Sequence, residues 1–209
     1  MTQPGADHAG QFINRLLRLG EERAGPQMAS HRASLAELRR GLGRTPGEAP
    51  GAYREVLAIL DDTAASIRFE DVCFQVATLY ALYPRNGGTP RSVEQGRRRN
   101  LGSSLRLLGG KDERRQGAER RVLALLNCNA DDLPDHLRHA VSLLQADDQP
   151  IDWRQLLTDL GGWSQEDRHV QRAWARAFWG YSANDESTMA TVTDITTNES
   201  DPETVATGE

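Results

Sequence analysis

Residues 69–80, FEDVCFQVATLY, carry the pattern that decides the fold. Apolar side chains recur there at the i, i+3, i+4 spacing of one helix face, at Phe69, Val72, Cys73, Val76, Ala77 and Tyr80. The same spacing returns at residues 12–17, 35–42, 53–60, 101–108, 122–126, 137–144, 153–160 and 170–178. No segment alternates apolar and polar residues for long enough to indicate a strand. We therefore expect an all-α protein, a compact bundle of about eight or nine helices.

Helix starts are indicated by short polar residues in front of three of the apolar stripes. Asp132, Asp152 and Ser164 stand where N-cap residues belong, because their side-chain oxygens can accept hydrogen bonds from the first free backbone N–H groups.

The length and the local composition predict one domain with a tail. A chain of 209 residues is long enough to bury a core without disulfides or metals. We expect a flexible N-terminus at 1–10 and a helical domain at 11–181, which could divide into two halves near 109–112. Residues 182–209 are rich in Thr, Ser, Asp and Glu and almost free of large apolar groups, so they are expected to form a disordered acidic tail.

The two cysteines and the N-terminus suggest the compartment. Cys73 lies among apolar residues, which favours a buried thiol in a reducing environment over a disulfide. The N-terminal residues show no signal-peptide pattern, and no apolar run approaches the roughly 20 residues of a membrane span. A cytoplasmic protein without membrane contact is expected.

Positive charge gathers in one part of an acidic chain. The net charge is −5, yet residues 85–121 hold 11 basic and 4 acidic residues, while the last 29 residues hold 7 acidic and no basic ones. The acidity is therefore a property of the tail. Because codon bias toward arginine would not cluster charge, the clustering itself is informative.

A helical projection of residues 99–108 separates the two kinds of side chain. Leu101, Leu105 and Leu108 fall on one side, and Arg99, Gly102, Ser103 and Arg106 fall on the other. Small residues between arginines would leave room for a polymer backbone, and guanidinium groups bind phosphate oxygens in a bidentate manner.

Other arginines extend this picture. Arg120 lies opposite the apolar face of residues 122–126. Arg40 points away from the apolar face of residues 35–42, and Arg39 flanks that second face and could snorkel. A further series occurs at positions 168, 172 and 176. These arginines form either a solvated face paired with acidic neighbours or a surface for a nucleic-acid backbone, bound by its phosphates rather than its bases.

The residues do not assemble into a catalytic or metal site. His136 and His139 lie near Asp132 and Asp135, but a dedicated metal site needs a third well-placed ligand. The stretch LRLLGGKD departs from a phosphate-binding P-loop at its first glycine and after its lysine. We expect a protein that is not an enzyme and that uses no metal and no cofactor.

Several motifs together resemble the CasB family, the small subunit of the type I-E CRISPR surveillance complex Cascade. They are SLAELRRGLGR (34–44), NLGSSLRLL (100–108), AERRVLALLN (118–127), LPDHLRHAVSLLQ (133–145), IDWRQLLTDLGGW (151–163) and VQRAWARAFWG (170–180). The resemblance runs in order from about residue 12 to residue 180, and its most specific part is the tryptophan-rich ending.

The resemblance implies an all-helical subunit without catalytic activity, present as a dimer. Its implied partners are the backbone and large subunits of Cascade, the heteroduplex of guide RNA and target DNA, and the displaced DNA strand, so that it stabilises the R-loop in antiviral defence. The implied contacts are Arg39, Arg40, Arg106, Arg120, Arg121 and Arg138. Leu107 stands where some relatives have a second basic residue.

Alternative interpretations of the arginines and aromatic residues stay open at this point. The protein could be a purely structural adaptor in a helical assembly, or a stand-alone helical nucleic-acid-binding protein. Trp153, Trp163, Trp174 and Phe178 could stack on bases, although their helical spacing favours the core or a subunit interface. Trp179 is the aromatic residue expected to be exposed.

Overall fold

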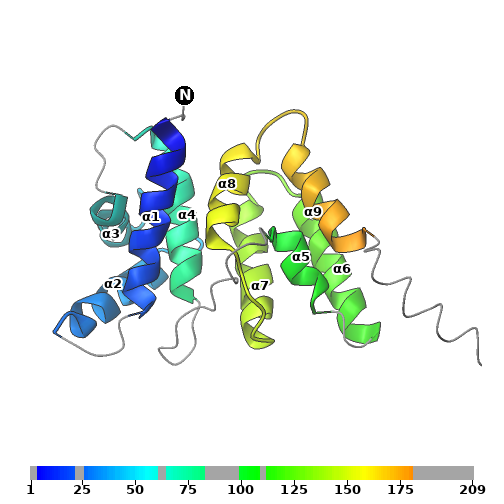
Figure 1. Cartoon of the computed structure of the whole chain (residues 1–209), viewed down its shortest axis with the longest axis horizontal. Coiled ribbons are helices and arrows are strands. Elements are labelled where there is room, and N and C mark those ends of the chain that lie inside the picture. Colours follow the sequence, from blue (N-terminus) through cyan, green and yellow to red (C-terminus); the bar gives the residue numbers. More distant parts are fainter. Residues whose placement is uncertain (1–3, 22–25, 61–64, 83–98, 109–111, 181–209) are drawn as a thin grey trace, which may run out of the picture. The chain divides into compact units, whose positions relative to one another are not determined.

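A computed structural model of the chain describes residues 4–21, 26–60, 65–82, 99–108 and 112–180. Within these ranges it contains nine helices and no strand (Figure 1). The all-α prediction is confirmed. The helices are α1 (Pro4–Glu21), α2 (Met28–Arg40), α3 (Pro50–Leu60), α4 (Ile67–Leu82), α5 (Leu101–Arg106), α6 (Asp112–Asn127), α7 (Leu133–Ala146), α8 (Trp153–Gly162) and α9 (His169–Trp179).

Helix α1 begins inside the range expected to be a flexible N-terminus. It starts at Pro4, a residue suited to a first helical position because its missing N–H needs no partner. Ala9 already packs against the core, and Arg154 of α8 donates a hydrogen bond of 3.0 Å to Asn14. The helical body therefore extends N-terminal to residue 11. The expected tail, residues 182–209, lies outside the described residues, as does most of the predicted junction at 109–112.

The stripe at residues 69–80 forms the centre of the core. Cys73, Val76, Ala77 and Tyr80 of α4 are fully buried. The stripe expected on α3 is only partly buried: Val56 and Leu60 are buried, whereas Leu57 is 40% exposed. The periodicity thus locates the core but assigns one position too many to it.

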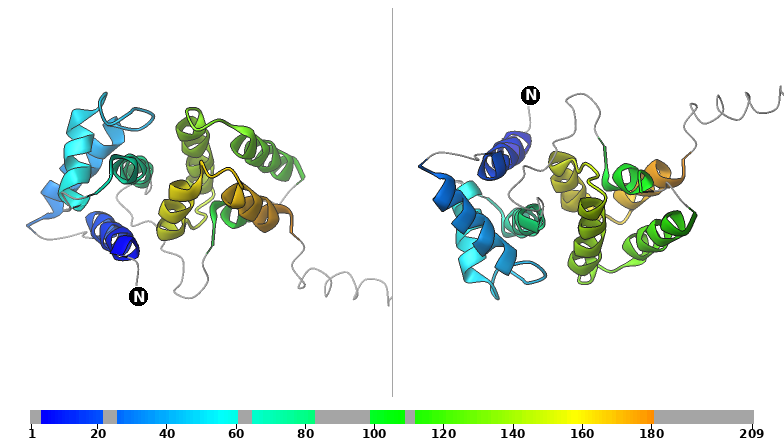
Figure 2. Two further views of the ribbon diagram at one scale, coloured as in Figure 1. Left: turned by 90° about the horizontal axis from the view of Figure 1, so that it is seen from above. Right: turned by 90° about the horizontal axis from the view of Figure 1, so that it is seen from below.

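Two groups of helices meet along α4 and α8. Helices α1, α2, α3 and α4 pack on one another, and α5, α6 and α7 pack together. Helix α8 lies against both α1 and α4, and α7 also contacts α4, as the views from above and below show (Figure 2). The core is therefore continuous from the first helix to the last.

Several arginines stabilise the C-terminal ends of other helices. Arg15 Nη1 donates to the carbonyl oxygens of Ile59 (3.1 Å) and Leu60 (3.2 Å) at the end of α3. Arg168 donates to the Leu126 carbonyl near the end of α6. The last four carbonyls of a helix lack intrahelical partners and carry partial negative charge, so a guanidinium satisfies both needs. Part of the arginine content therefore serves the fold.

The predicted N-caps have different outcomes. Asp152 is confirmed, because its Oδ1 accepts a hydrogen bond of 2.9 Å from the Gln155 backbone N–H. Asp132 occupies the N-cap position of α7 without a side-chain bond. The prediction for Ser164 is wrong, since α9 begins at His169 and Arg168 has a left-handed backbone (φ 50°) that interrupts any helix before it.

The two cysteines are free thiols, and Cys73 is buried as expected. Among the residues that the structure describes, no helix is both long and apolar enough to cross a membrane.

Candidate nucleic-acid interface

The sequence placed Gly102 and Ser103 on an open face between arginines, and the structure corrects this. Gly102 is buried where α5 meets α9: a Cβ at this position would lie 2.2 Å from the carbonyl oxygen of Trp174. Only glycine allows this approach. The Asn100 side chain accepts a hydrogen bond of 3.0 Å from the Ser103 N–H and donates one of 3.2 Å to the Ala173 carbonyl. The small residues therefore make room for helix α9 and leave none for a polymer.

The two arginines of that face are only partly accessible. Arg99 precedes α5 and is half-buried. Arg106 ends α5, is also half-buried, and is already engaged in an interaction within the chain. Neither residue forms the open cationic face that the helical projection predicts.

Helix α6 presents two exposed arginines side by side in the sequence. Val122 and Leu125 bury one face of α6, and Arg120 is exposed on another side of the helix. Within the described part of the chain Arg120 makes no hydrogen bond or ion pair. Arg121 is exposed as well, and its Nη1 donates a hydrogen bond of 2.9 Å to the Gly117 carbonyl of the same helix. These neighbouring guanidinium groups are open to solvent.

The remaining predicted arginines have weak or local partners. Arg40 is paired with Glu37, three residues earlier on α2, and 73% of its side chain is exposed. Arg138 Nε lies 4.0 Å from Asp135 Oδ1, one turn earlier on α7. Exposed pairs of this kind contribute only about 0–1 kcal/mol, so phosphate oxygens can replace these carboxylates. Arg39 is different, because its Nε donates to the Ala81 carbonyl near the end of α4.

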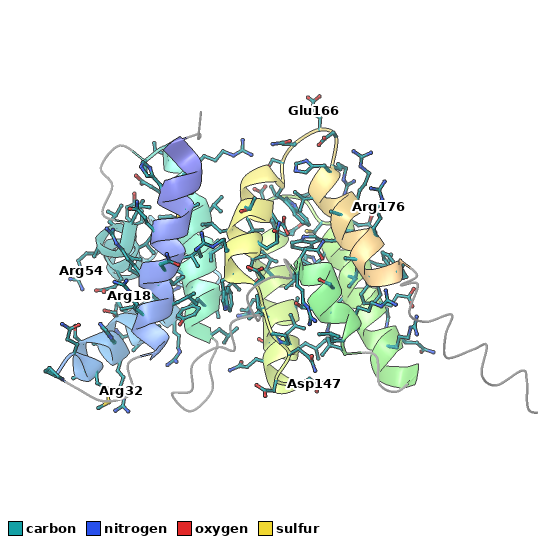
Figure 3. The ribbon with its side chains drawn as sticks, viewed as in Figure 1. Arg18, Arg32, Arg54, Asp147, Glu166 and Arg176 are labelled. Carbon is teal, nitrogen blue, oxygen red and sulfur yellow. The ribbon has the colours of Figure 1, made fainter. Side chains whose placement is uncertain are left out.

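The arginine series at positions 168, 172 and 176 also contains one residue with a partner inside the protein and two that are open to solvent. Arg168 is bound to the Leu126 carbonyl, while Arg172 and Arg176 are exposed. Figure 3 shows Arg176 on the outer side of α9. Exposed arginines thus occur on α6 and α9, and α7 carries the half-buried Arg138.

The aromatic residues mostly belong to the core, as their spacing predicted. Trp153, Trp163, Trp174 and Phe178 are buried, and the rings of Trp163 and Trp174 have centroids 5.0 Å apart. They are therefore not available for stacking on bases. Trp179 is 38% exposed, as expected.

A buried carboxylate links α8 to α9, and the sequence reasoning missed it. Asp159 is 8% exposed; its Oδ2 accepts a hydrogen bond of 2.7 Å from the Trp174 indole, and its Oδ1 accepts one of 2.8 Å from Gln155 Nε2. Burial raises the pKa of Asp159, and the two hydrogen bonds oppose the rise. The sequence did carry a sign of this buried carboxylate, because Asp159 falls within the apolar stripe of residues 153–160. The residues described contain no group of three His, Cys, Asp or Glu side chains placed to hold a metal.

Comparisons with known proteins agree with this architecture. The family model described as CRISPR-associated protein Cse2 matches residues 34–179. A Cse2 protein of Thermus thermophilus is 31% identical over 176 residues, which cover 84% of this chain and 92% of the relative. The crystal structure of CasB from Thermus thermophilus superposes with a TM-score of 0.65 at 30% identity, covering 86% of this chain and 100% of that one. A chain of a CRISPR RNA-guided surveillance complex gives a TM-score of 0.63 at 29% identity, covering 90% and 97%.

Proposed function

The chain belongs to the Cse2 (CasB) family of CRISPR-associated proteins, and on that premise we propose that it is a non-catalytic small subunit of a type I-E Cascade complex that binds DNA backbones through surface arginines. The observation that carries the proposal is the exposed Arg120–Arg121 pair on α6. It lies within the segment of residues 85–121, whose local charge is +7 in a chain of net charge −5.

Assembly with other subunits is supported by a relative. A chain with 29% identity and the same fold is part of a CRISPR RNA-guided surveillance complex. In such a complex this subunit would contact the backbone and large subunits, a second copy of itself, and the strands of the R-loop.

The physical role follows from the energetics of strand exchange. Replacing a DNA duplex by a heteroduplex of guide RNA and target DNA changes the free energy little, so modest contacts to the strands can decide the outcome. Arginine–phosphate contacts are independent of sequence and release counterions. Four such contacts to a single strand would give a salt slope of about −3.

The structure ranks the seven predicted arginines by availability. Arg40, Arg120 and Arg121 are exposed. Arg39 donates to a carbonyl of another helix, Arg106 is half-buried and engaged within the protein, and Arg99 and Arg138 are half-buried. We therefore propose the first three as the main phosphate contacts and the other four as secondary ones.

The test reverses the charge of the α6 pair in the assembled complex. Arg120→Glu with Arg121→Glu is expected to weaken target-DNA binding about tenfold and to reduce the salt slope by about 1.4. Arg54→Glu on α3, which is 77% exposed, is the matched control and is expected to change neither. Native mass spectrometry of each complex checks that assembly is intact.

Two rival functions predict different outcomes of the same experiment. If the protein is purely a structural adaptor, charge reversal on α6 disrupts assembly and leaves DNA retention by intact complexes unchanged. If it is a stand-alone nucleic-acid-binding protein, the isolated wild-type chain binds single-stranded DNA at low salt without partners. Unchanged affinity and an unchanged salt slope in intact complexes would overturn the proposed role.

A further inference from the structure

A surface pocket is lined in part by acidic side chains. It has a cavity volume of about 440 Å³ and is enclosed by the turn after α2, one side of α4 and the loop that leads into α7. Pockets of this size accommodate small ligands or a few side chains. All three walls belong to the same compact unit of the protein.

The turn after α2 is a preformed wall. Gly43 has a φ of 74°, a left-handed conformation that favours glycine. The backbone N–H and the Oγ1 of Thr45 donate to Glu48 Oε2 at 2.9 and 3.1 Å, and these bonds lower the pKa of Glu48. The turn is thus held by its own hydrogen bonds.

The pocket floor is apolar and contains one polar atom without a partner. Phe74 and Leu79 of α4 are buried, and Leu42 packs beside them. Gln75, which also lines the pocket, has a buried Nε2 with no hydrogen-bond acceptor. Water cannot reach this atom, so a ligand in the pocket cannot reach it either, and recognition here depends on the apolar floor and the charged rim.

The rim carries two carboxylates. Asp71 of α4 and Asp131 of the loop before α7 are exposed, and neither forms an ion pair within the described residues. Arg44 also lines the rim, where its charge acts on Glu48. Carboxylates placed beside an apolar floor suit a side chain that has an apolar stem and a cationic head.

We infer that this pocket binds an arginine or lysine side chain presented by a neighbouring protein subunit. The cation lies between Asp71 and Asp131, and its methylene stem contacts Phe74 and Leu79. Nucleic acid is disfavoured here because the carboxylates repel phosphate. The inference rests on the proposed function, since it takes the neighbour to be another subunit of the complex.

The test measures assembly with the other subunits of the complex. Asp71→Asn combined with Asp131→Asn removes both charges and keeps the side-chain shapes, and Ala130→Trp blocks the pocket from its exposed rim. Each variant is expected to weaken binding to the complex lacking the small subunit about tenfold, which corresponds to about 1.4 kcal/mol. Glu166→Gln and Ala58→Trp, at exposed positions outside the pocket, are the controls and are expected to bind normally.

A photo-crosslinking amino acid at position 130 identifies the occupant. The inference expects a crosslinked peptide from another subunit that contains an arginine or lysine. A crosslink to a peptide without a basic residue, or wild-type assembly by both pocket variants, would overturn it. The arginine reversals on α6 test the proposed function separately, because they are read by DNA affinity in complexes that have already formed.

Discussion

The indole Nε1 of Trp174 donates a hydrogen bond of 2.7 Å to Oδ2 of Asp159, and both residues are buried. This bond joins α9 to α8 and gives a polar atom of each helix a partner inside the apolar core. Gln155 donates to the other carboxylate oxygen at 2.8 Å, so both oxygens of Asp159 have a partner.

Replacing Asp159 by leucine is expected to destabilise the protein. The change leaves the buried indole N–H without an acceptor, which costs about 1–3 kcal/mol. Urea unfolding monitored by tryptophan fluorescence measures the loss. Asp159→Asn keeps an acceptor for Trp174 and is expected to cost less; an equal cost for the two variants would contradict the role of the bond.

Stability should also depend on pH through this carboxyl group. Burial raises the pKa of Asp159 above its ordinary 3.8, so the folded protein holds the proton more tightly than the unfolded chain. Protonation of Asp159 therefore stabilises the folded protein fully at pH values below 3.8, and this stabilisation is lost as the pH rises through the raised pKa. The free energy of unfolding of Asp159→Asn, relative to wild type, is therefore expected to improve as the pH rises from about 4 to about 7. A constant difference over this range would show that the pKa is not raised.

Gly102→Ala tests the contact between α5 and α9. The added Cβ would lie 2.2 Å from the Trp174 carbonyl oxygen, so the helices must separate, at a cost of about 1–3 kcal/mol. Gly161→Ala in α8 is the control, since nothing lies within 4 Å of its Cβ position. That change is expected to be neutral or to stabilise by up to about 1 kcal/mol. Thermal unfolding compares the two; similar shifts would contradict the packing argument.

Arg15→Gln tests the capping of α3 by α1. It replaces the cation that donates to the Ile59 and Leu60 carbonyls and is expected to lower the free energy of unfolding by about 1–2 kcal/mol. Arg18→Gln removes an exposed arginine from the same helix and should stay within about 0.5 kcal/mol of wild type. Equal effects in denaturant unfolding would mean that only net charge matters.

The two thiols should differ in reactivity. Burial raises the pKa of Cys73 to about 12, whereas Cys128 is half-buried. A thiol-specific disulfide reagent at mildly alkaline pH is expected to modify one thiol per native chain and both after unfolding in urea. In Cys128→Ser the native chain should then react slowly or not at all. Rapid modification of Cys73 in that variant would show that α4 opens readily.

Much of the fold could be predicted from the sequence because helix formation depends on local patterns. The apolar stripes at residues 69–80 and 153–160 predict α4 and α8, and Asp152 predicts where α8 begins. The burial of Trp174 and Phe178 and the exposure of Trp179 also follow from the helical period. The early start of α1 was not visible, because residues 4–11 have only small and polar side chains.

The candidate interface could be predicted only in part. The sequence identified a cluster of positive charge, but a helical projection cannot show that α9 covers Gly102 or that Arg39 reaches the Ala81 carbonyl of another helix. Which arginines remain available was decided by long-range contacts.

The sequence by itself determined an all-helical protein, its apolar faces and the concentration of arginine, since periodicity and charge are properties of neighbouring residues. Only the tertiary structure decided that Asp159 would meet Trp174, that Arg15 would cap α3, and that Asp71 and Asp131 would line one pocket. The physical reason is that these pairs are brought together by the packing of whole helices, and the energy of that packing is spread over the entire core.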